Sequence, residues 1–448
     1  MDIFKKCYTY TIANELREKG IYPYFHALET RQDVEVVMEG KRRIMLGSNN
    51  YLGLTTNPEV LEAGLDALKQ YGTGCSGSRF LNGTLRLHLQ LEEELAAFLN
   101  KTGCTTFSTG FQSNLGIISA IVGHGDYVIC DKENHASIYD GCKLSYGRML
   151  TYAHSNMEEL EIQLQKVPES AGCLIVTDGV FSMGGDIAKL PEIVQLARKY
   201  GARVMVDDAH GLGVVGEGGR GTASHFGLES EVDLIMGTFS KSLASLGGYL
   251  VADATVVDFV RHNSRPFIFS ASMPPANAAV ALAALRYIRS HPEIVKRLSE
   301  LSQYMRGNLK SRGVPIIEST TPIIPIYTYT FENTLLKARA LYDAGVYVNP
   351  VLPPATALAG ISPYVTWIST HRGGHEQWRT DLPGQPPEVF DLRTGERVDI
   401  VVEDPQEPEF RDMAVVGGRW AAWIDRTPFG LYLADLTTGR ATRLPVDD

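Results

Sequence analysis

Short apolar runs rich in β-branched residues alternate with helical segments through most of the chain, and this alternation restricts the possible folds more than any other feature. Three such runs cover residues 127–130, 172–176 and 203–206, and a helical pattern at 191–200 separates the last two. The order strand, helix, strand predicts a mainly parallel sheet covered by helices. In sheets of this kind, functional residues gather at the carboxyl ends of the strands. The sequence therefore predicts an α/β protein with its site at one sheet edge.

Four segments are expected along the chain. Residues 1–55 should hold an amphipathic helix over the first 20 residues and then a hairpin that turns at Glu39-Gly40-Lys41. Residues 56–290 should form the large domain. Residues 291–360 should form a smaller α+β domain with a strand at 323–329, and residues 361–448 a separate β-rich tail.

Bulk composition excludes several classes of protein. The 448 residues are 44% hydrophobic and carry a formal net charge of −10, which is ordinary for a globular enzyme and unsuited to binding nucleic acid. No secretory signal is visible, and no apolar run reaches the roughly 18 residues of a membrane span. Six cysteines without CxxC pairs indicate reduced thiols and a cytoplasmic location, and no metal site is expected.

The tail differs from the rest of the chain in composition. All four tryptophans follow residue 366, all six cysteines precede residue 174, and Lys337 is the last lysine. The sequence Asp-Leu-Arg-Thr-Gly at 391–395 recurs as Asp-Leu-Thr-Thr-Gly at 435–439, a period of 44 residues, and a hairpin with a Gly-Gly turn is expected at 415–424. Short strands with this period resemble a β-propeller blade. Since a closed propeller needs about four blades or more, the tail is interpreted as a fragment or small appendage, with an unrelated β-rich extension as the alternative.

Lys241 and Asp207 suggest the chemistry. Lys241 lies in a loop rich in Ser, Thr and Gly, 34 residues after Asp207, which directly follows the run 203–206. A lysine amine forms a Schiff base with pyridoxal phosphate (PLP), and a carboxylate keeps the pyridine nitrogen protonated, which stabilises a substrate carbanion. His210 is close enough in sequence to contact the phenolic oxygen of the cofactor. Alternatively, Asp207 is a capping or loop residue and His210 a structural histidine.

A phosphate site is predicted where residues 109–114 precede an apolar helix, because the first N–H groups of a helix attract anions. The hydroxyls of Thr238 and Ser240 can add to that site. His135 follows the run 127–130 and can stack on the cofactor ring, although a lone histidine is usually incidental. None of these signals is specific alone.

Eight motifs in order carry a family resemblance, and they lie at residues 48–54, 74–79, 81–84, 134–137, 178–186, 207–211, 237–248 and 353–356. Together they make residues 1–357 similar to the α-oxoamine synthases, PLP-dependent enzymes of aminotransferase fold type I. Within that family, the segment 239–245 is most similar to the serine palmitoyltransferases, because glycine-using and biotin-pathway members usually carry Gly before the lysine.

The resemblance implies a role for each candidate residue. It makes Lys241, His135, Asp207 and His210 the catalytic residues, and it places Asn49 or Asn50 beside the substrate. The cofactor-binding residues that it implies are Gly110, Phe111, His135, Ser182, Asp207, His210, Thr238, Ser240 and Lys241. His135 would stack on the ring and assist proton transfer, while residues 270–275 would complete the partner's phosphate site in a homodimer.

The implied reaction is a decarboxylative condensation of L-serine with a long-chain acyl-CoA. With palmitoyl-CoA it gives 3-ketosphinganine, CoA and CO2, and Lys241 removes the Cα proton of the amino acid. The alternative is another α-oxoamine synthase, which joins glycine or alanine to a different acyl-CoA. Peripheral contact with a membrane is compatible with either reading.

The chain departs from the family after Ala357. Relatives continue into a Leu-Leu-Arg strand whose arginine holds the amino-acid carboxylate, whereas here the tail follows, and Arg372 stands in a different context. The small domain is therefore expected to be incomplete. We expect PLP binding with poor turnover unless another arginine substitutes, and an inactive fusion that acts as an interaction protein is the remaining hypothesis.

Overall fold

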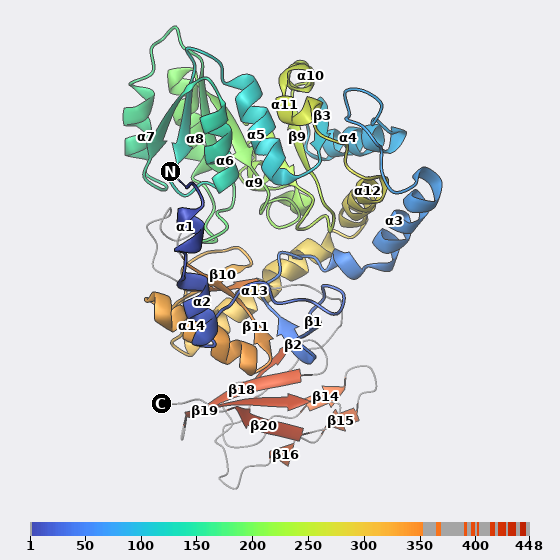
Figure 1. Cartoon of the computed structure of the whole chain (residues 1–448), viewed down its shortest axis with the longest axis vertical. Coiled ribbons are helices and arrows are strands. Elements are labelled where there is room, and N and C mark those ends of the chain that lie inside the picture. Colours follow the sequence, from blue (N-terminus) through green and yellow to red (C-terminus); the bar gives the residue numbers. More distant parts are fainter. Residues whose placement is uncertain are drawn as a thin grey trace.

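The computed structural model describes residues 2–352 and, beyond them, the backbone of strands between residues 364 and 444. A seven-stranded sheet forms the centre of the large domain (Figure 1). Its strands, in spatial order, are β3 (Gly103–Phe107), β9 (Gly248–Ala252), β8 (Leu234–Thr238), β7 (Arg203–Asp207), β6 (Cys173–Asp178), β4 (Tyr127–Asp131) and β5 (Arg148–Tyr152). Only β9 runs antiparallel to its neighbours in this sheet, which confirms the mainly parallel α/β fold.

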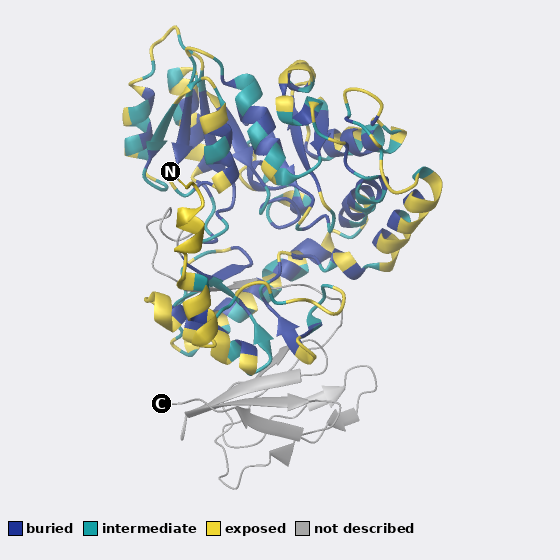
Figure 2. Ribbon diagram, viewed as in Figure 1, coloured by how far each residue is buried: buried dark blue, intermediate teal, exposed yellow. Residues whose placement is uncertain are grey.

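Helices cover both faces of this sheet, so its strands are apolar on both sides. Successive side chains of a strand point to opposite faces. Accordingly, Val204 and Val206 of β7 join one core cluster, and Met205 joins the other. The first cluster takes side chains from α3 (Pro58–Tyr71), α4 (Arg86–Phe98), α7 (Met157–Leu164), α8 (Leu190–Tyr200) and α12 (Pro275–Ser290). The second takes them from α5 (Gly110–Ile121), α6 (Ala136–Leu144), α10 (Ala254–Asn263) and α11 (Arg265–Ile268). Figure 2 shows most strands of this sheet in the dark blue of buried residues.

Three short helical elements complete the large domain: η1 (Leu54–Thr56), η2 (Glu217–Gly219) and α9 (Thr222–His225). Among the helices of the described residues, none combines the length and hydropathy needed to cross a bilayer.

The smaller domain contains strands from two distant parts of the sequence, residues 35–45 and residues 323–368. The predicted hairpin is present as β1 (Glu35–Met38) and β2 (Lys41–Met45), and β11 (Val346–Tyr347) extends it as a parallel third strand. A second sheet has the order β10 (Ile323–Tyr327), β13 (Tyr364–Ile368), β12 (Asn349–Val351), with antiparallel pairing throughout. The helices α13 (Glu293–Ser311) and α14 (Phe331–Asp343) belong to the same part of the chain. The strand expected at 323–329 therefore exists and ends at Tyr327.

The first 20 residues form two short helices where one was expected. They are α1 (Lys5–Tyr8) and α2 (Ile12–Glu18). The hydroxyl of Thr9 bonds back to the Lys5 carbonyl, and that of Thr11 bonds to Glu15 Oε1 at 2.6 Å, so local side-chain bonds replace a continuous helix between them. Leu16 is buried as expected, whereas Ile12 is 53% exposed.

The tail is β-rich as expected. Its strands are β14 (Val389–Asp391), β15 (Glu396–Val398), β16 (Val401–Val402), β17 (Met413–Val416), β18 (Trp420–Arg426), β19 (Phe429–Asp435) and β20 (Arg440–Leu444). The predicted hairpin at 415–424 is the antiparallel pair β17 and β18. Both copies of the repeat join antiparallel strands, because Asp391 pairs with Glu396 and Asp435 pairs with Arg440. The relation to a propeller blade stays a prediction.

Candidate active site

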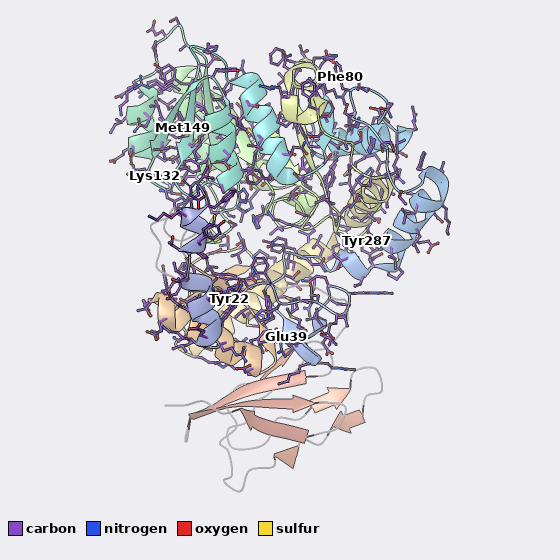
Figure 3. The ribbon with its side chains drawn as sticks, viewed as in Figure 1. Tyr22, Glu39, Phe80, Lys132, Met149 and Tyr287 are labelled. Carbon is purple, nitrogen blue, oxygen red and sulfur yellow. The ribbon has the colours of Figure 1, made fainter. Side chains whose placement is uncertain are left out.

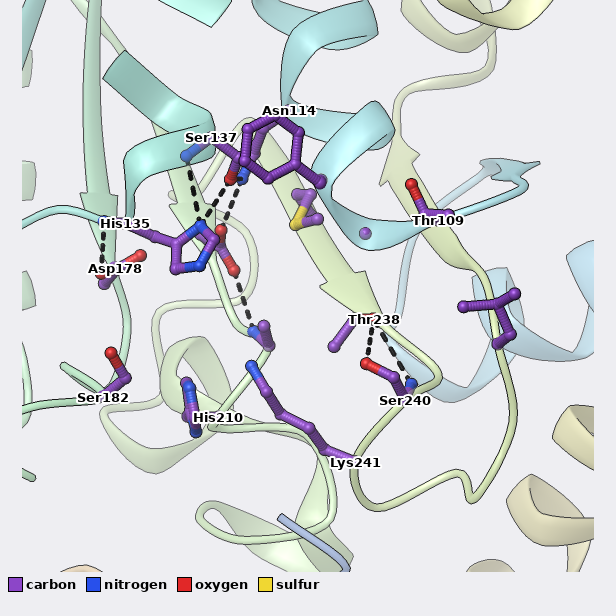
Figure 4. A pocket seen from close by; sticks show the side chains of 16 residues that line it. Thr109, Asn114, His135, Ser137, Asp178, Ser182, His210, Thr238, Ser240 and Lys241 are labelled. Carbon is purple, nitrogen blue, oxygen red and sulfur yellow. Dashed lines mark hydrogen bonds between the residues drawn. The ribbon is translucent and has the colours of Figure 1, made fainter. Parts of the chain in front are cut away.

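A pocket of about 250 Å³ lies at the carboxyl ends of β6, β7 and β8, the edge that the strand order predicted. Figure 4 shows it from close by. Its lining residues are Thr109, Gly110, Phe111, Asn114, His135, Ser137, Asp178, Ser182, Asp207, Ala209, His210, Met236, Thr238, Ser240, Lys241 and Leu246. All nine residues predicted to bind the cofactor belong to this set, although they come from five separate stretches of the sequence.

The side chain of Lys241 reaches into the pocket from the loop that follows β8 (Figure 4). Burial lowers the pKa of its amine to about 8, and the carboxylates of Asp207 and Asp178 limit the shift by favouring the charged form. A lysine with a pKa near 8 is partly neutral at physiological pH, and a neutral amine is both a nucleophile and a base. Lys241 therefore has the properties needed to attach a carbonyl compound.

Asp207 ends β7 and is held by two donors. Its Oδ1 accepts the backbone N–H of Ala209 at 3.0 Å, and its Oδ2 accepts Asn114 Nδ2 at 2.7 Å. Asn114 lies on the buried side of α5 and gives its other N–H to Ser137 Oγ at 2.8 Å. Asn114 ends the segment 109–114 that predicts the phosphate site, but that pattern assigns no role to its side chain.

Two histidines line the pocket, one at the start of α6 and the other after β7. His135 caps the N-terminus of α6, and its Nδ1 lies 2.7 Å from Ser137 Oγ. His210 follows β7, and its Nδ1 lies 2.7 Å from the hydroxyl of Tyr51. Burial lowers the pKa of both imidazoles, and the charge of Lys241 lowers them further, while Asp207 opposes the shift at His135. Both rings are therefore neutral at physiological pH.

A second buried carboxyl, Asp178, ends β6 beside Asp207. Its Oδ2 accepts the backbone N–H of His135 at 2.9 Å, which ties the start of α6 to the sheet edge. Burial raises the pKa of Asp178 well above its usual value, and the neighbouring charge of Asp207 adds to the shift. Asp178 thus holds a proton more readily than an ordinary aspartate.

The N-terminus of α5 and two hydroxyls form a polar cradle on another wall. Thr109 caps the helix by accepting the N–H of Gln112 at 3.1 Å, which leaves the N–H groups of the first turn directed outward. Thr238 Oγ1 and Ser240 Oγ lie 3.0 Å apart next to this turn. A Cβ on Gly110 would come within 2.7 Å of Thr238 Oγ1, so only glycine leaves the cradle open.

The loop that carries Ser182 is attached to both domains. On the large-domain side, Asp186 Oδ2 lies 2.9 Å from His154 Nε2. On the small-domain side, Thr321 Oγ1 donates to the Gly185 carbonyl at 2.7 Å. Gly185 has a φ of +72°, and an added Cβ would meet the Ile323 carbonyl at 2.7 Å, so the loop and the small domain touch closely. Ser182 lines the pocket from a wall that both domains hold in place.

The predicted substrate residues Asn49 and Asn50 are not among the residues that line the pocket. Asn49 is exposed, and Asn50 is buried and donates to Thr55 Oγ1 at 2.7 Å. The next residue, Tyr51, is the one whose side chain contacts a pocket residue, through His210. The role of the two asparagines stays a prediction, and so does any role of Arg372 and of residues 353–356, which lie outside the described residues.

The model of the aminotransferase class I and II family matches residues 41–363. The chain belongs to this family. It is 51% identical over 346 residues to a serine palmitoyltransferase from Sphingobacterium spiritivorum, an alignment that covers 77% of this chain and 87% of that protein. It is 50% identical to a serine palmitoyltransferase from Bacteroides thetaiotaomicron (82% and 93% covered), and 43% identical to an 8-amino-7-oxononanoate synthase from Geobacter sulfurreducens (81% and 94%).

Solved structures agree with this assignment. Serine palmitoyltransferase from S. paucimobilis, solved with a bound PLP–myriocin aldimine, matches with a TM-score of 0.80 and 38% identity over 83% of this chain and 94% of that one. The corresponding enzyme from Sphingomonas wittichii matches with a TM-score of 0.79 and 36% identity over 83% and 94%. The fold is therefore PLP-dependent fold type I, and the chain is an α-oxoamine synthase, a PLP-dependent acyltransferase.

The residues of the pocket fit PLP group by group. A phosphate needs donors, and the first turn of α5 with the hydroxyls of Thr238 and Ser240 supplies them. An aldehyde needs an amine that is neutral near pH 8, which Lys241 supplies. A pyridinium nitrogen needs a fixed carboxylate, which Asp207 supplies. PLP is the cofactor of this enzyme, as the sequence predicted.

Proposed function

We propose that the protein condenses L-serine with palmitoyl-CoA, with loss of CO2 and CoA, to give 3-ketosphinganine. The observation that carries this proposal is the high identity, 50–51% over most of the chain, to proteins named serine palmitoyltransferase. Ser240 immediately before Lys241 supports it, because the sequence pattern of that loop is the one that resembles the serine-using members. The pocket geometry is compatible with this chemistry and does not itself select the amino acid.

Each pocket residue receives a proposed part in this reaction. Lys241 binds the cofactor and later moves the Cα proton of the amino acid. Asp207 pairs with the pyridine nitrogen, and Asn114 and the N–H of Ala209 hold its carboxylate in place. When bound, PLP supplies an electron-withdrawing ring that stabilises negative charge at Cα.

The phosphate and the ring faces are assigned to the remaining residues. Gly110, Phe111, Thr238, Ser240 and Ser182 hold the phosphate, and all five line the pocket. His135 lies against the ring, and His210 meets its phenolic oxygen. The exposed Asn49 and the buried Asn50 remain candidates for substrate contact.

The protein is also proposed to act as a homodimer. Exposed apolar side chains lie near the point where residues 77–78 and 271–272 run side by side. Ser78 and Ala271 form an isolated β-bridge there, and the backbone N–H of Ser272 donates to the Gly77 carbonyl. Leu81 is 77% exposed and Phe269 is 80% exposed there. Phe80, labelled in Figure 3, extends this surface next to α10, where it packs edge-on against His262. Residues 270–275, which the sequence resemblance implies at the dimer contact, belong to one of these two segments.

We also propose that the protein is located in the cytoplasm. The six cysteines all lie within the described residues and are all free thiols, as expected in a reducing compartment.

The alternative hypothesis is that the protein catalyses a different α-oxoamine synthase reaction. It is favoured by identities of 40–43% to proteins named 8-amino-7-oxononanoate synthase. Under it, glycine or alanine would replace serine and a different acyl-CoA would be used.

Two measurements on the PLP-loaded protein separate these hypotheses. Titration with serine, glycine and alanine should change the absorbance of the bound cofactor most strongly with serine. CoA release should then be faster with palmitoyl-CoA than with short-chain acyl-CoA. A spectral response to glycine or alanine without one to serine would contradict the proposed function.

The same assay tests whether the replaced C-terminus impairs turnover. The sequence predicts slow CoA release because no Leu-Leu-Arg strand follows Ala357. Rates equal to those of a full-length relative would contradict that prediction. Cofactor binding without any CoA release would favour the inactive fusion.

A further inference from the structure

The groups that donate hydrogen bonds to His135 and His210 determine which ring nitrogen of each histidine carries the proton. The backbone N–H of Ser137 lies 3.2 Å from His135 Nδ1. A peptide N–H can only donate, so this ring nitrogen must be an unprotonated acceptor. The hydroxyl of Ser137 lies 2.7 Å from the same nitrogen and already accepts an N–H from Asn114, which leaves its own hydrogen free to point at His135.

Tyr51 plays the corresponding part for His210. Its ring is completely buried, and burial raises the pKa of its phenol far above the usual value, so the hydroxyl keeps its proton. Within the described residues, His210 Nδ1 at 2.7 Å is the hydrogen-bond partner of that hydroxyl. If Nδ1 carried the hydrogen, the buried O–H would have no acceptor, which costs about 1–3 kcal/mol. The stable arrangement therefore has Tyr51 donating to Nδ1.

A neutral imidazole carries a single proton, and both rings are neutral in this pocket. With Nδ1 acting as an acceptor in each ring, that proton lies on Nε2. The Nε2 atoms of both histidines are the ring nitrogens left for a ligand, because no protein partner of either atom is found in the described part of the chain.

We propose that Tyr51 and Ser137 fix both pocket imidazoles as Nε2–H donors and leave Lys241 as the nitrogen base of the pocket. Neither Nε2 has a lone pair with which to accept a proton. The two rings can hold anionic or carbonyl oxygens of a bound ligand, and Lys241 takes the proton. His135 thereby receives a donor's part, where the sequence resemblance implied assistance in proton transfer. The statement about Lys241 rests on the proposed function, whereas the proton positions do not.

Histidine-selective ¹⁵N NMR of the cofactor-free protein tests the assignment directly. At pH 8 the wild-type spectrum should show an unprotonated Nδ1 and a protonated Nε2 for both rings, with signals identified by their loss in His135→Gln and His210→Gln. Tyr51→Phe should convert His210 to a mixture of both tautomers and leave His135 unchanged. Ser137→Ala should broaden or shift the His135 signals alone, because the peptide N–H of residue 137 remains.

Tyr249→Phe is the matched control. Tyr249 on β9 is as deeply buried as Tyr51, but its hydroxyl has no hydrogen-bond partner within the described residues, so its removal should change neither histidine. A protonated Nδ1 on either ring of the wild-type protein would overturn the proposal, even if a variant fails to fold. So would an unchanged His210 spectrum in Tyr51→Phe. A protein with the expected spectrum but no reaction with serine would contradict the proposed function and leave the donor assignment intact.

Discussion

Asn114 is the residue through which the polar side chains of the pocket are connected. One amide group bonds to Asp207 on β7 and to Ser137 on α6, and Ser137 in turn contacts His135. Asp207 and His135 are thus connected through a single buried side chain. Its own Oδ1 is buried and has no hydrogen-bond partner in the described part of the chain.

Replacing Asn114 should weaken cofactor binding. In Asn114→Ala, Asp207 Oδ2 loses a donor to a charged group, a change of about 1.5–3 kcal/mol, or roughly tenfold to a hundredfold in the dissociation constant of PLP. Equilibrium titration of the cofactor-free protein with PLP measures this. The control is Asn263→Ala, since that exposed amide bonds only to the Phe259 carbonyl of its own helix. Equal affinity in both variants would contradict the assigned role.

The lowered pKa of Lys241 predicts how cofactor attachment depends on pH. Only the neutral amine reacts with an aldehyde, so the rate should rise with pH and reach half its maximum near pH 8. An ordinary lysine, with a pKa of 10.5, would still be accelerating at pH 9. Stopped-flow absorbance after mixing cofactor-free protein with PLP gives the profile, and Lys241→Ala gives the background. A midpoint near 10 would show that burial does not act as described.

His154 joins three acidic side chains beside the pocket and predicts a pH-dependent stability. Burial alone would lower its pKa, but hydrogen bonds to Asp131 and Asp186 outweigh burial and raise the pKa to about 10. Glu133 lies 3.8 Å from the same ring nitrogen as Asp186. Because the folded pKa lies above the unfolded value of 6.5, the charged ring stabilises the fold fully below pH 6.5, and this contribution disappears as pH rises through about 10.

The His154→Gln variant tests that dependence. At pH 6 it should be less stable than the wild-type protein by about 2 kcal/mol, between the values of exposed and buried ion pairs. The difference should shrink toward zero at pH 10.5. Thermal melting at both values measures it, with His124→Gln as the control, because His124 is exposed and stacks on Tyr146. A difference that grows with pH would contradict the prediction.

At the level of the elements, β13 occupies the middle of the small domain's second sheet. It pairs with β10 on one side and β12 on the other, and β10 and β12 do not pair with each other. β13 lies beyond residues 1–357, the part of the chain that resembles the α-oxoamine synthases. It completes a sheet whose other two strands, β10 and β12, lie within those residues. The small domain, which the sequence predicts to be incomplete, therefore has a three-stranded sheet with β13 as its central strand.

This arrangement predicts where the chain can be shortened. A chain that ends at residue 368 keeps β13 and should melt cooperatively. A chain that ends at residue 363 leaves the facing edges of β10 and β12 unpaired, and it should melt several degrees lower and aggregate. Thermal unfolding and size-exclusion chromatography compare the two. Equal behaviour would show that β13 contributes nothing to the sheet.

Sequence reasoning located the elements better than the contacts between them. The positions of Asp178 and Asp207 at strand ends, and of Gly110 at a helix start, follow from local patterns that recur in α/β proteins. The bonds from Tyr51 to His210 and from Asn114 to Asp207 span 159 and 93 residues. Such pairs have no periodic signal, because they depend on which loops the completed fold brings together.

At the scale of the whole molecule, the exposed surface around Leu81 and Phe269 predicts assembly. Leu81→Asp places a charge in the proposed dimer contact, which should shift the protein toward monomer and lower its PLP content. Analytical ultracentrifugation and cofactor absorbance measure both effects. Ile162→Asp is the control, since Ile162 on α7 is also exposed, at 52%. A Leu81→Asp protein that sediments like the wild type would contradict the assignment of this surface.

The Gly185 carbonyl, which accepts hydroxyl hydrogens from Ser319 and Thr321, has a consequence for how the molecule admits a ligand. The two domains cannot separate at Gly185 without breaking both hydrogen bonds and exposing the polar groups that form them. The loop that carries Ser182 is therefore fastened to the small domain by these two hydrogen bonds. Ser240 and Leu246 line the same pocket and are exposed, so we expect a ligand to enter past these two residues.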